Sequence, residues 1–205
     1  MVLFVVLPLL LIVLYALQDG SGHFTFANIA KFFTDRDALA TFAVSLEVGI
    51  ETTLICILLG YPAAWILSNR ELNKSAVTIV LFILPMWINA LMRTLATTEL
   101  FNMLKIPLGK GTLIFGMVYD FLPFMIYPIY NILLKMDKSY AEAAEDLGAS
   151  PLKVFTRVTL PLSMPGVATA AILSFIFAWN NFMFALVLSG SSTKTLPVAI
   201  FDFVG

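Results

Sequence analysis

The 205-residue sequence is 60% hydrophobic and only 12% charged, and its mean hydropathy is +0.94. A water-soluble domain carries about twice that share of charged residues, so the composition argues against a soluble enzyme. The formal net charge of −1 leaves no basic surface for nucleic acid. A single cysteine, Cys56, and a single histidine, His23, argue against an intrachain disulfide and a His/Cys metal centre.

Five apolar stretches are candidates for membrane spans, because a helix needs about 20 mostly apolar residues to cross the hydrocarbon core. They cover residues 1–17, 42–67, 76–96, 112–134 and 166–188. The first stretch has a signal peptide as its alternative, but it has neither a basic leading segment nor a small-x-small cleavage pattern. The sequence therefore predicts an all-α integral membrane protein, with one transmembrane domain over residues 1–205.

The connections between these stretches are polar and fall on two sides of the membrane. Residues 18–40 and 97–111 share one side, and residues 68–75 and 135–165 share the other, because successive spans alternate. Connection 68–75 is predicted as a tight turn with Arg70, Glu71 and Lys74. Lys and Arg divide equally between the two sides, so the positive-inside rule leaves the orientation open.

The connection over residues 135–165 carries the most specific pattern in the chain. The run Glu142-Ala143-Ala144 is followed after three residues by Gly148, and nine residues further by Val158-Thr159-Leu160-Pro161. This segment resembles the EAA loop of permease subunits in type I binding-protein-dependent ABC importers. Val158 stands where that family usually has Ile.

Local chemistry predicts two short helices in this loop. Residues 140–147 are good helix formers, and Gly148 is suited to the left-handed residue that ends a helix. Ser150-Pro151 is typical of a helix start. The resemblance implies that the first helix docks in a groove of a cytoplasmic ATPase subunit and couples its closure to the spans. The ATPase-coupling residues are then Glu142, Ala143, Ala144, Gly148, Leu160 and Pro161. The alternative is a solvated amphipathic loop with no partner.

The resemblance also implies an orientation and a set of partners. The loop would be cytoplasmic, in a multi-pass protein of the bacterial inner or plasma membrane. Partners would be ABC ATPase subunits, a second permease subunit that is identical or different, and an extracytoplasmic solute-binding protein.

The family has six spans, whereas five are found here, so we expect a fragment or a truncated gene. No G-x-x-x-x-G-K-[ST] loop occurs, so the chain is expected to have no enzymatic activity and no cofactor, with ATP bound by the partner.

Two parts of the chain resemble different importer subfamilies. Residues 59–161 resemble the first permease subunit of spermidine/putrescine importers, through segments 59–65, 84–94 and 118–125. Beyond residue 173, segments 178–186 and 194–197 resemble sugar-importer permeases. A polyamine is the favoured substrate, and a sugar is the alternative. A membrane-embedded enzyme is a remote alternative, since no catalytic motif occurs. A channel is also a remote alternative, because its function would not require the Glu142–Pro161 segment.

Depth along the spans gives a separate indication of a substrate path. Helical rise places Glu51 and Asp120 about 13 and 12 Å below one boundary, and Trp87 about 16 Å above the other. Charges at this depth are costly and usually face a pathway or a partner, and an aromatic face can bind an ammonium group. Pairing of each carboxylate with another subunit or the backbone is the alternative. Glu47 and Arg93 are predicted to snorkel to the outer boundary. The hypothetical path residues are Glu51, Trp87, Asn89, Tyr119, Asp120, Trp179 and Asn180.

Overall fold

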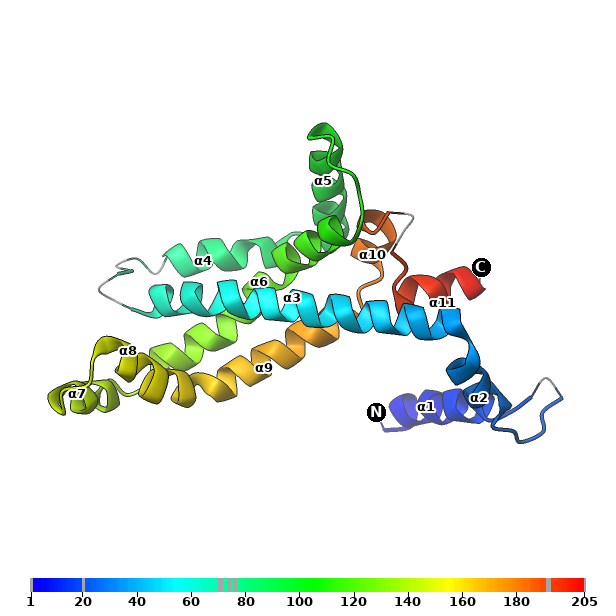
Figure 1. Cartoon of the computed structure of the whole chain (residues 1–205), viewed down its shortest axis with the longest axis horizontal. Helices are drawn as coiled ribbons and strands as arrows, with labels where there is room; N and C mark the ends of the chain where they lie inside the picture. The colour runs from blue at the N-terminus through cyan, green and yellow to red at the C-terminus, as the bar shows by residue number, and fades with distance from the viewer. Residues whose placement is uncertain are drawn as a thin grey trace. The chain divides into compact units, whose positions relative to one another are not determined.

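The computed structural model describes residues 2–19, 21–69, 72–73, 75, 77–190 and 193–204. Within these residues the regular structure is helical, apart from an isolated bridge between Gln18 and Phe24 (Figure 1). The predicted all-α class is therefore confirmed. The chain divides into two compact units, Met1–Val44 and Ser45–Gly205. Arg70, Glu71 and Lys74 of the predicted turn lie outside the described residues.

The first unit contains helices α1 (Val2–Ala16) and α2 (Ala27–Thr34), and the start of α3. Asn28 fixes the start of α2 by donating from Nδ2 to the carbonyl oxygen of Gln18 at 2.8 Å. Helix α1 is apolar but has only 15 residues, which is fewer than the about 20 that a span needs. The predicted span over residues 1–17 is thus a shorter apolar helix in the structure.

Three helical segments are long and apolar enough to cross a membrane. They are α3 (Arg36–Ser68), α6 (Lys110–Lys135) and the continuous run Pro151–Trp179, which ends with α9 (Leu160–Trp179). Helices α6 and α9 pack closely where Gly166 faces Ile132, because a Cβ at Gly166 would lie 2.6 Å from Ile132 Cδ1. These helices contain the predicted spans over residues 42–67 and 112–134.

The predicted span over residues 76–96 is not one straight helix, and its first residue lies outside the described part of the chain. Helix α4 (Val77–Ile83) runs into a 3-10 turn, η1 (Leu84–Trp87), and α5 (Ala90–Met103) then leaves at 93°. The break follows from Asn89, whose Oδ1 accepts from the backbone N–H of Leu91 at 2.9 Å and so starts a new helix. The described residues therefore hold three candidate spans, or four if the bent pair counts as one.

The predicted span over residues 166–188 is displaced in the structure. Its helix ends at Trp179, and the Oδ1 of Asn181 accepts from Phe184 N–H at 2.8 Å, which starts the separate helix α10 (Met183–Leu188). A last helix, α11, covers Leu196–Val204. At the other end the helix begins earlier than predicted, since α8 (Pro151–Val154) and the π-helical turn η2 (Phe155–Thr159) continue into α9. Residues 151–165 of the predicted loop therefore belong to the long helix.

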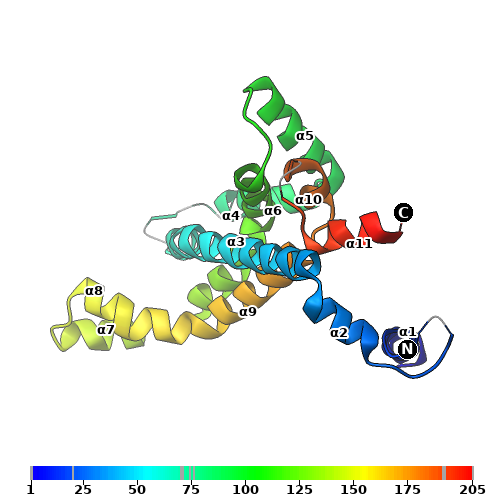
Figure 2. The same ribbon diagram turned by 45° about the vertical axis from the view of Figure 1, so that its right-hand side comes forward.

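The second unit has two distinct ends. Helices α7 (Ser139–Asp146) and α8 form a hairpin beyond one end of α6 and α9, and both views show α10 near the opposite end (Figures 1 and 2). Helix α10 packs against α5 and α6 at that opposite end. The hairpin end and the packed end carry the two groups of residues that the sequence singled out.

Candidate functional site

Helix α7 is an exposed helix with a capped start. None of its side chains is buried, and Glu142 and Ala143 are exposed whereas Ala144 is half-buried. Oδ1 of Asp137 accepts from the backbone N–H of Ser139 at 2.9 Å. This bond stabilises the ionised carboxylate and lowers the pKa of Asp137 below its ordinary value. The cap fixes where the helix begins and leaves its sides open.

Helix α7 ends just before Gly148, and this glycine terminates it as the sequence predicts. The φ of Gly148 is +79°, a left-handed conformation that favours glycine. Its N–H donates to the carbonyl oxygen of Glu145 at 2.8 Å, and Ala149 N–H donates to that of Ala144 at 3.0 Å. This pair of bonds is the Schellman motif. A Cβ at Gly148 would meet no atom within 4 Å, so the backbone conformation, not space, requires the glycine.

The hairpin continues directly into a long helix. Ser150 has extended backbone angles and Pro151 occupies the first turn of α8, as predicted for a helix start. Leu160 and Pro161 lie at the start of α9, beyond the π-helical turn η2. The two halves of the motif thus occupy different positions, since Glu142–Gly148 forms the exposed hairpin and Leu160-Pro161 lies within the run Pro151–Trp179.

A contact that sequence reasoning did not find ties this helix to α3. The hydroxyl of Tyr61 and Oγ of Ser163 are 2.9 Å apart, and both residues are buried. The Tyr61 ring also meets Phe155 of η2 edge to face, with centroids 5.8 Å apart. Tyr61 lies in the segment 59–65 that carries the spermidine/putrescine resemblance, but nothing in that segment indicates its partner.

The residues of the hypothetical substrate path have different partners in the structure. Asp120 pairs with Arg93, Glu51 pairs with Lys110, and Asn89 caps α5. Trp87 is 86% exposed, and Tyr119 is 41% exposed. Glu51, Asn89 and Asp120 are thus engaged in contacts within this chain.

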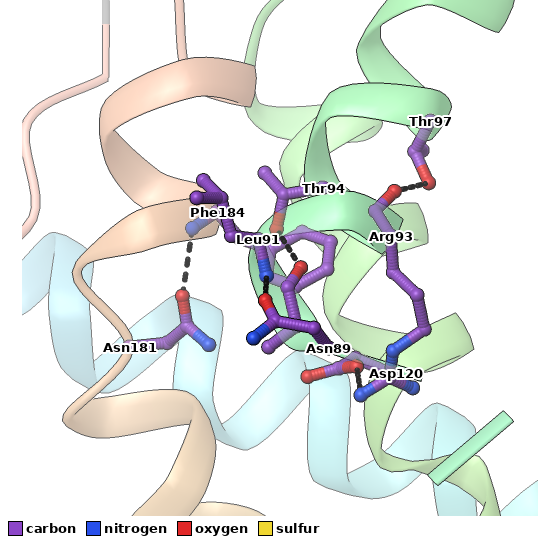
Figure 3. Close-up of polar contacts among 9 residues, drawn as sticks. Asn89, Leu91, Arg93, Thr94, Thr97, Asp120, Asn181 and Phe184 are labelled. Carbon is purple, nitrogen blue, oxygen red and sulfur yellow. Dashed lines mark hydrogen bonds and ion pairs between the residues drawn. The ribbon is translucent and has the colours of Figure 1, made fainter. Parts of the chain in front are cut away.

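Arg93 and Asp120 form a buried ion pair between α5 and α6 (Figure 3). Each side chain is only 6% exposed. The Nε and Nη1 groups of Arg93 have no hydrogen-bond partner in the described part of the structure. The prediction that Arg93 snorkels to the boundary is wrong, because the bend at Asn89 turns α5 so that Arg93 faces α6.

Lys110 forms a second, more exposed charged cluster with α3. Its Nζ lies 2.7 Å from Glu47 Oε1 and 3.0 Å from Glu51 Oε1, and the two carboxylate side chains are 54% and 39% exposed. The sequence offered a neighbouring subunit or the backbone as partners for Glu51, and predicted that Glu47 snorkels. The structure instead pairs both with one intrachain ammonium group at the start of α6.

Trp179 and Asn180 lie at the end of α9. The ring of Trp179 packs on Phe175, with centroids 5.9 Å apart, and Asn180 Nδ2 donates to the carbonyl oxygen of Ile176 at 2.9 Å. With Leu46 they line a hollow of about 260 Å³. Among the described residues, no three His, Cys, Asp or Glu side chains gather closely enough to hold a metal ion.

Comparison with known proteins agrees with this architecture of apolar helices and a projecting hairpin. The family model "Binding-protein-dependent transport system inner membrane component" matches residues 1–203. The chain belongs to this family. It is a multi-pass inner membrane protein and a permease subunit of an ABC importer. The family is one of transport permeases and not of enzymes.

The names of individual relatives mention more than one kind of substrate. The spermidine/putrescine transport system permease protein PotB of Salmonella typhimurium is 33% identical over 93% of this chain and 74% of its own length. The trehalose transport system permease protein SugB of Mycobacterium tuberculosis is 32% identical over 88% of this chain and 66% of its own length.

Among solved structures, a bacterial ABC transporter involved in the import of the acidic polysaccharide alginate is similar to this chain. The TM-score is 0.76, and the match covers 97% of this chain and 73% of that one. Sequence identity is 21%, so this likeness shows the fold alone. The two chains therefore share one fold over nearly the whole of this chain.

Proposed function

We propose that this chain forms part of the translocation path of the importer and that α7 is its coupling helix, held by a cytoplasmic ATPase subunit. The observation that carries this proposal is the exposed α7, which is fixed at both ends and joined to a helix of 29 residues that is long enough to span the membrane. The chain has no phosphate-cradling loop of its own, so ATP would bind to the partner, and this chain would need no cofactor.

The proposed coupling uses the residues that the resemblance indicated. Glu142 would accept a hydrogen bond from a basic group of the ATPase, and the small side chains of Ala143 and Ala144 would allow close approach. Gly148 would form the turn through which movement of α7 reaches Leu160 and Pro161 in the long helix. The ATPase can drive this movement only if its ATP-bound and ATP-free states hold α7 differently.

The same proposal supplies the other partners. A second permease subunit would complete the path, and an extracytoplasmic solute-binding protein would deliver the substrate. The Tyr61–Ser163 hydrogen bond supports a route for movement from the long helix to α3, because it joins the two helices near η2.

Substitution of Gly148 tests the docking of the ATPase. Gly148→Val should abolish co-purification of the ATPase with the full chain, since a β-branched residue is strongly disfavoured at a φ of +79°. Gly148→Asn is the matched control, because Asn tolerates this conformation, and it should retain the ATPase. Equal thermal stability of the two variants in detergent would show that only the hairpin changed. Retention of the ATPase by Gly148→Val would contradict the proposal.

We further propose that the transported solute is a small cationic amine, a polyamine of the spermidine/putrescine type. The name and 33% identity of the PotB relatives support this choice. Glu51 and Glu47 also present half-exposed carboxylates that could receive an ammonium group. The proposed path residues remain Glu51, Trp87, Asn89, Tyr119, Asp120, Trp179 and Asn180, brought together by the second permease subunit.

A sugar is the second candidate substrate. The SugB relative favours it, and Trp179 and Asn180 border a hollow with an aromatic wall. Uptake of labelled putrescine and trehalose by the complete importer would separate the two. If the substrate is an amine, Glu51→Gln should lower putrescine uptake severalfold, and Glu99→Gln, at an exposed position of α5, should not. Trehalose uptake without putrescine uptake would exclude the amine.

A further inference from the structure

We infer that the open pocket beside the α7–α8 hairpin binds a linear cationic amine, and that the bound amine slows ATP-driven coupling. We call it the hairpin pocket, and its cavity measures about 370 Å³. Its walls come from α7, from α8 and η2, and from the chain ends of α3 and α6. A cavity of this size lies within the range of small-molecule sites. The effect on coupling rests on the proposed function of α7.

The described walls of the hairpin pocket are predominantly acidic. Asp137, Glu142 and Glu145 contribute carboxylates, whereas Lys138 contributes the single ammonium group among the described lining residues. The side chains of Glu142 and Glu145 make no hydrogen bond or ion pair with any residue that the structure describes. Their acceptor oxygens are therefore available to a positively charged ligand.

Aromatic and apolar side chains complete the pocket. Trp65 is 40% exposed and Tyr140 is 58% exposed, so each ring can present a face to an alkylammonium group. Leu133 and Val154 are buried side chains of the lining and offer contact to methylene groups. This combination of carboxylates, ring faces and apolar surface matches a chain of methylene groups with an ammonium group at each end.

Within the described residues, no three metal-ligating side chains come close enough together to hold one ion. The carboxylates of the hairpin pocket lie just before α7 and on α7 itself. Each carboxylate can pair with a separate charge on one ligand, and a diamine or a longer linear amine supplies such charges.

The position of the hairpin pocket links binding to movement. Part of its wall is α7, and another part comes from Phe155, Val158 and Thr159 of η2. A π-helical turn often marks a functional irregularity in a helix. A ligand that bridges these two parts would hold α7 in one position against η2, so the ATPase could no longer shift α7 between the positions of its ATP-bound and ATP-free states. Amine that accumulates on this side of the membrane would then reduce ATP hydrolysis.

Direct binding can be measured on the purified full chain. In a Trp87→Phe/Trp179→Phe background, Trp65 is the remaining tryptophan of three, and its fluorescence reports on the pocket. Titration with 1,4-diaminobutane should give a saturable change, and 1,4-butanediol, a neutral molecule of the same length, should give none. An equal response to both compounds, or no saturable response, would overturn the inference.

Charge removal on α7 provides a matched pair of variants. Glu145→Gln should raise the half-saturating diamine concentration about two- to fivefold, which is the usual effect of one exposed charge. Asp146→Asn removes the same charge from the neighbouring residue, which is exposed and does not line the pocket, and should leave the concentration nearly unchanged. Equal shifts for both variants would contradict binding in the pocket.

The effect on coupling is measured on the complete importer in vesicles. The diamine on the hairpin side should lower the ATPase rate, Trp65→Leu should raise the half-inhibitory concentration about two- to fivefold, and Trp65→Phe should retain most of the inhibition. If the importer takes up amine but Trp65 fluorescence shows no diamine binding, this inference alone is overturned. If Trp65 fluorescence shows diamine binding but the importer takes up no amine, the proposed substrate is overturned and the inferred pocket is retained.

Discussion

The packed end and the hairpin end of the second unit handle the same residue types in opposite ways. At the packed end, the carboxylate of Asp120 is buried and paired with Arg93, and Gly116 admits the side chains of α10. At the hairpin end, Asp137 is exposed and caps α7, and Gly148 provides a backbone turn with open space around it. The comparison teaches that burial decides whether such a residue holds the fold together or shapes a surface for partners.

The largest expected effect comes from breaking the buried ion pair. Arg93→Met should lower the free energy of unfolding by about 3–5 kcal/mol, because Asp120 would be left buried without a counter-charge. Thermal unfolding of the detergent-solubilised chain measures the loss. The double variant Arg93→Met/Asp120→Leu should recover most of it, since the unpaired charge is then gone. An unchanged unfolding temperature for Arg93→Met would remove the proposed contrast between the two ends.

A smaller effect is expected from filling the space at Gly116. A Cβ there would lie 2.5 Å from Leu188 Cδ1 and 2.8 Å from Phe184 Cδ1, so Gly116→Ala should cost about 1–3 kcal/mol through overpacking. Gly111→Ala is the control in the same helix, because nothing lies within 4 Å of its Cβ position. Thermal unfolding of both variants measures the difference. Equal stability of the two would show that α10 moves aside without cost.

The smallest expected effect is a pH dependence at the start of α7. The pKa of Asp137 is lowered in the folded chain. At pH values above the ordinary pKa of Asp, its ionised carboxylate therefore stabilises α7. This stabilisation is lost as the pH falls through the lowered pKa. Amide exchange of α7 in the wild type and in Asp137→Ala should therefore differ near neutral pH and converge in acid, because alanine has no side-chain acceptor. Asp35→Ala, which removes a similar cap outside α7, is the control. Identical exchange in α7 at neutral pH would contradict a role for the cap.

The hairpin end could be predicted from the sequence because its signals are local. Gly148 ends a helix by its own conformational freedom, and Ser150-Pro151 starts the next one within two residues. The structure confirms the positions of both. The coupling role assigned to this segment stays a prediction, because it depends on a protein that is absent from the sequence.

The packed end could not be predicted in the same way. The pairing of Arg93 with Asp120 joins two helices, and hydropathy along one segment contains no information about its neighbour. Asn89 and Asn181 are polar residues that cap new helices, but apolar residues on both sides made each stretch resemble one continuous span. The connection was predicted to extend to residue 165, whereas Pro161 and Pro165 both lie within α9.

The unbroken helix from Pro151 to Trp179 has a mechanical consequence. At 1.5 Å per residue its 29 residues extend about 43 Å. A rigid tilt of about 5° at the hairpin would displace the far terminus by about 4 Å, which is comparable to the width of a methylene chain. Trp179, at that terminus, is thus the residue of the helix that a tilt at the hairpin displaces most.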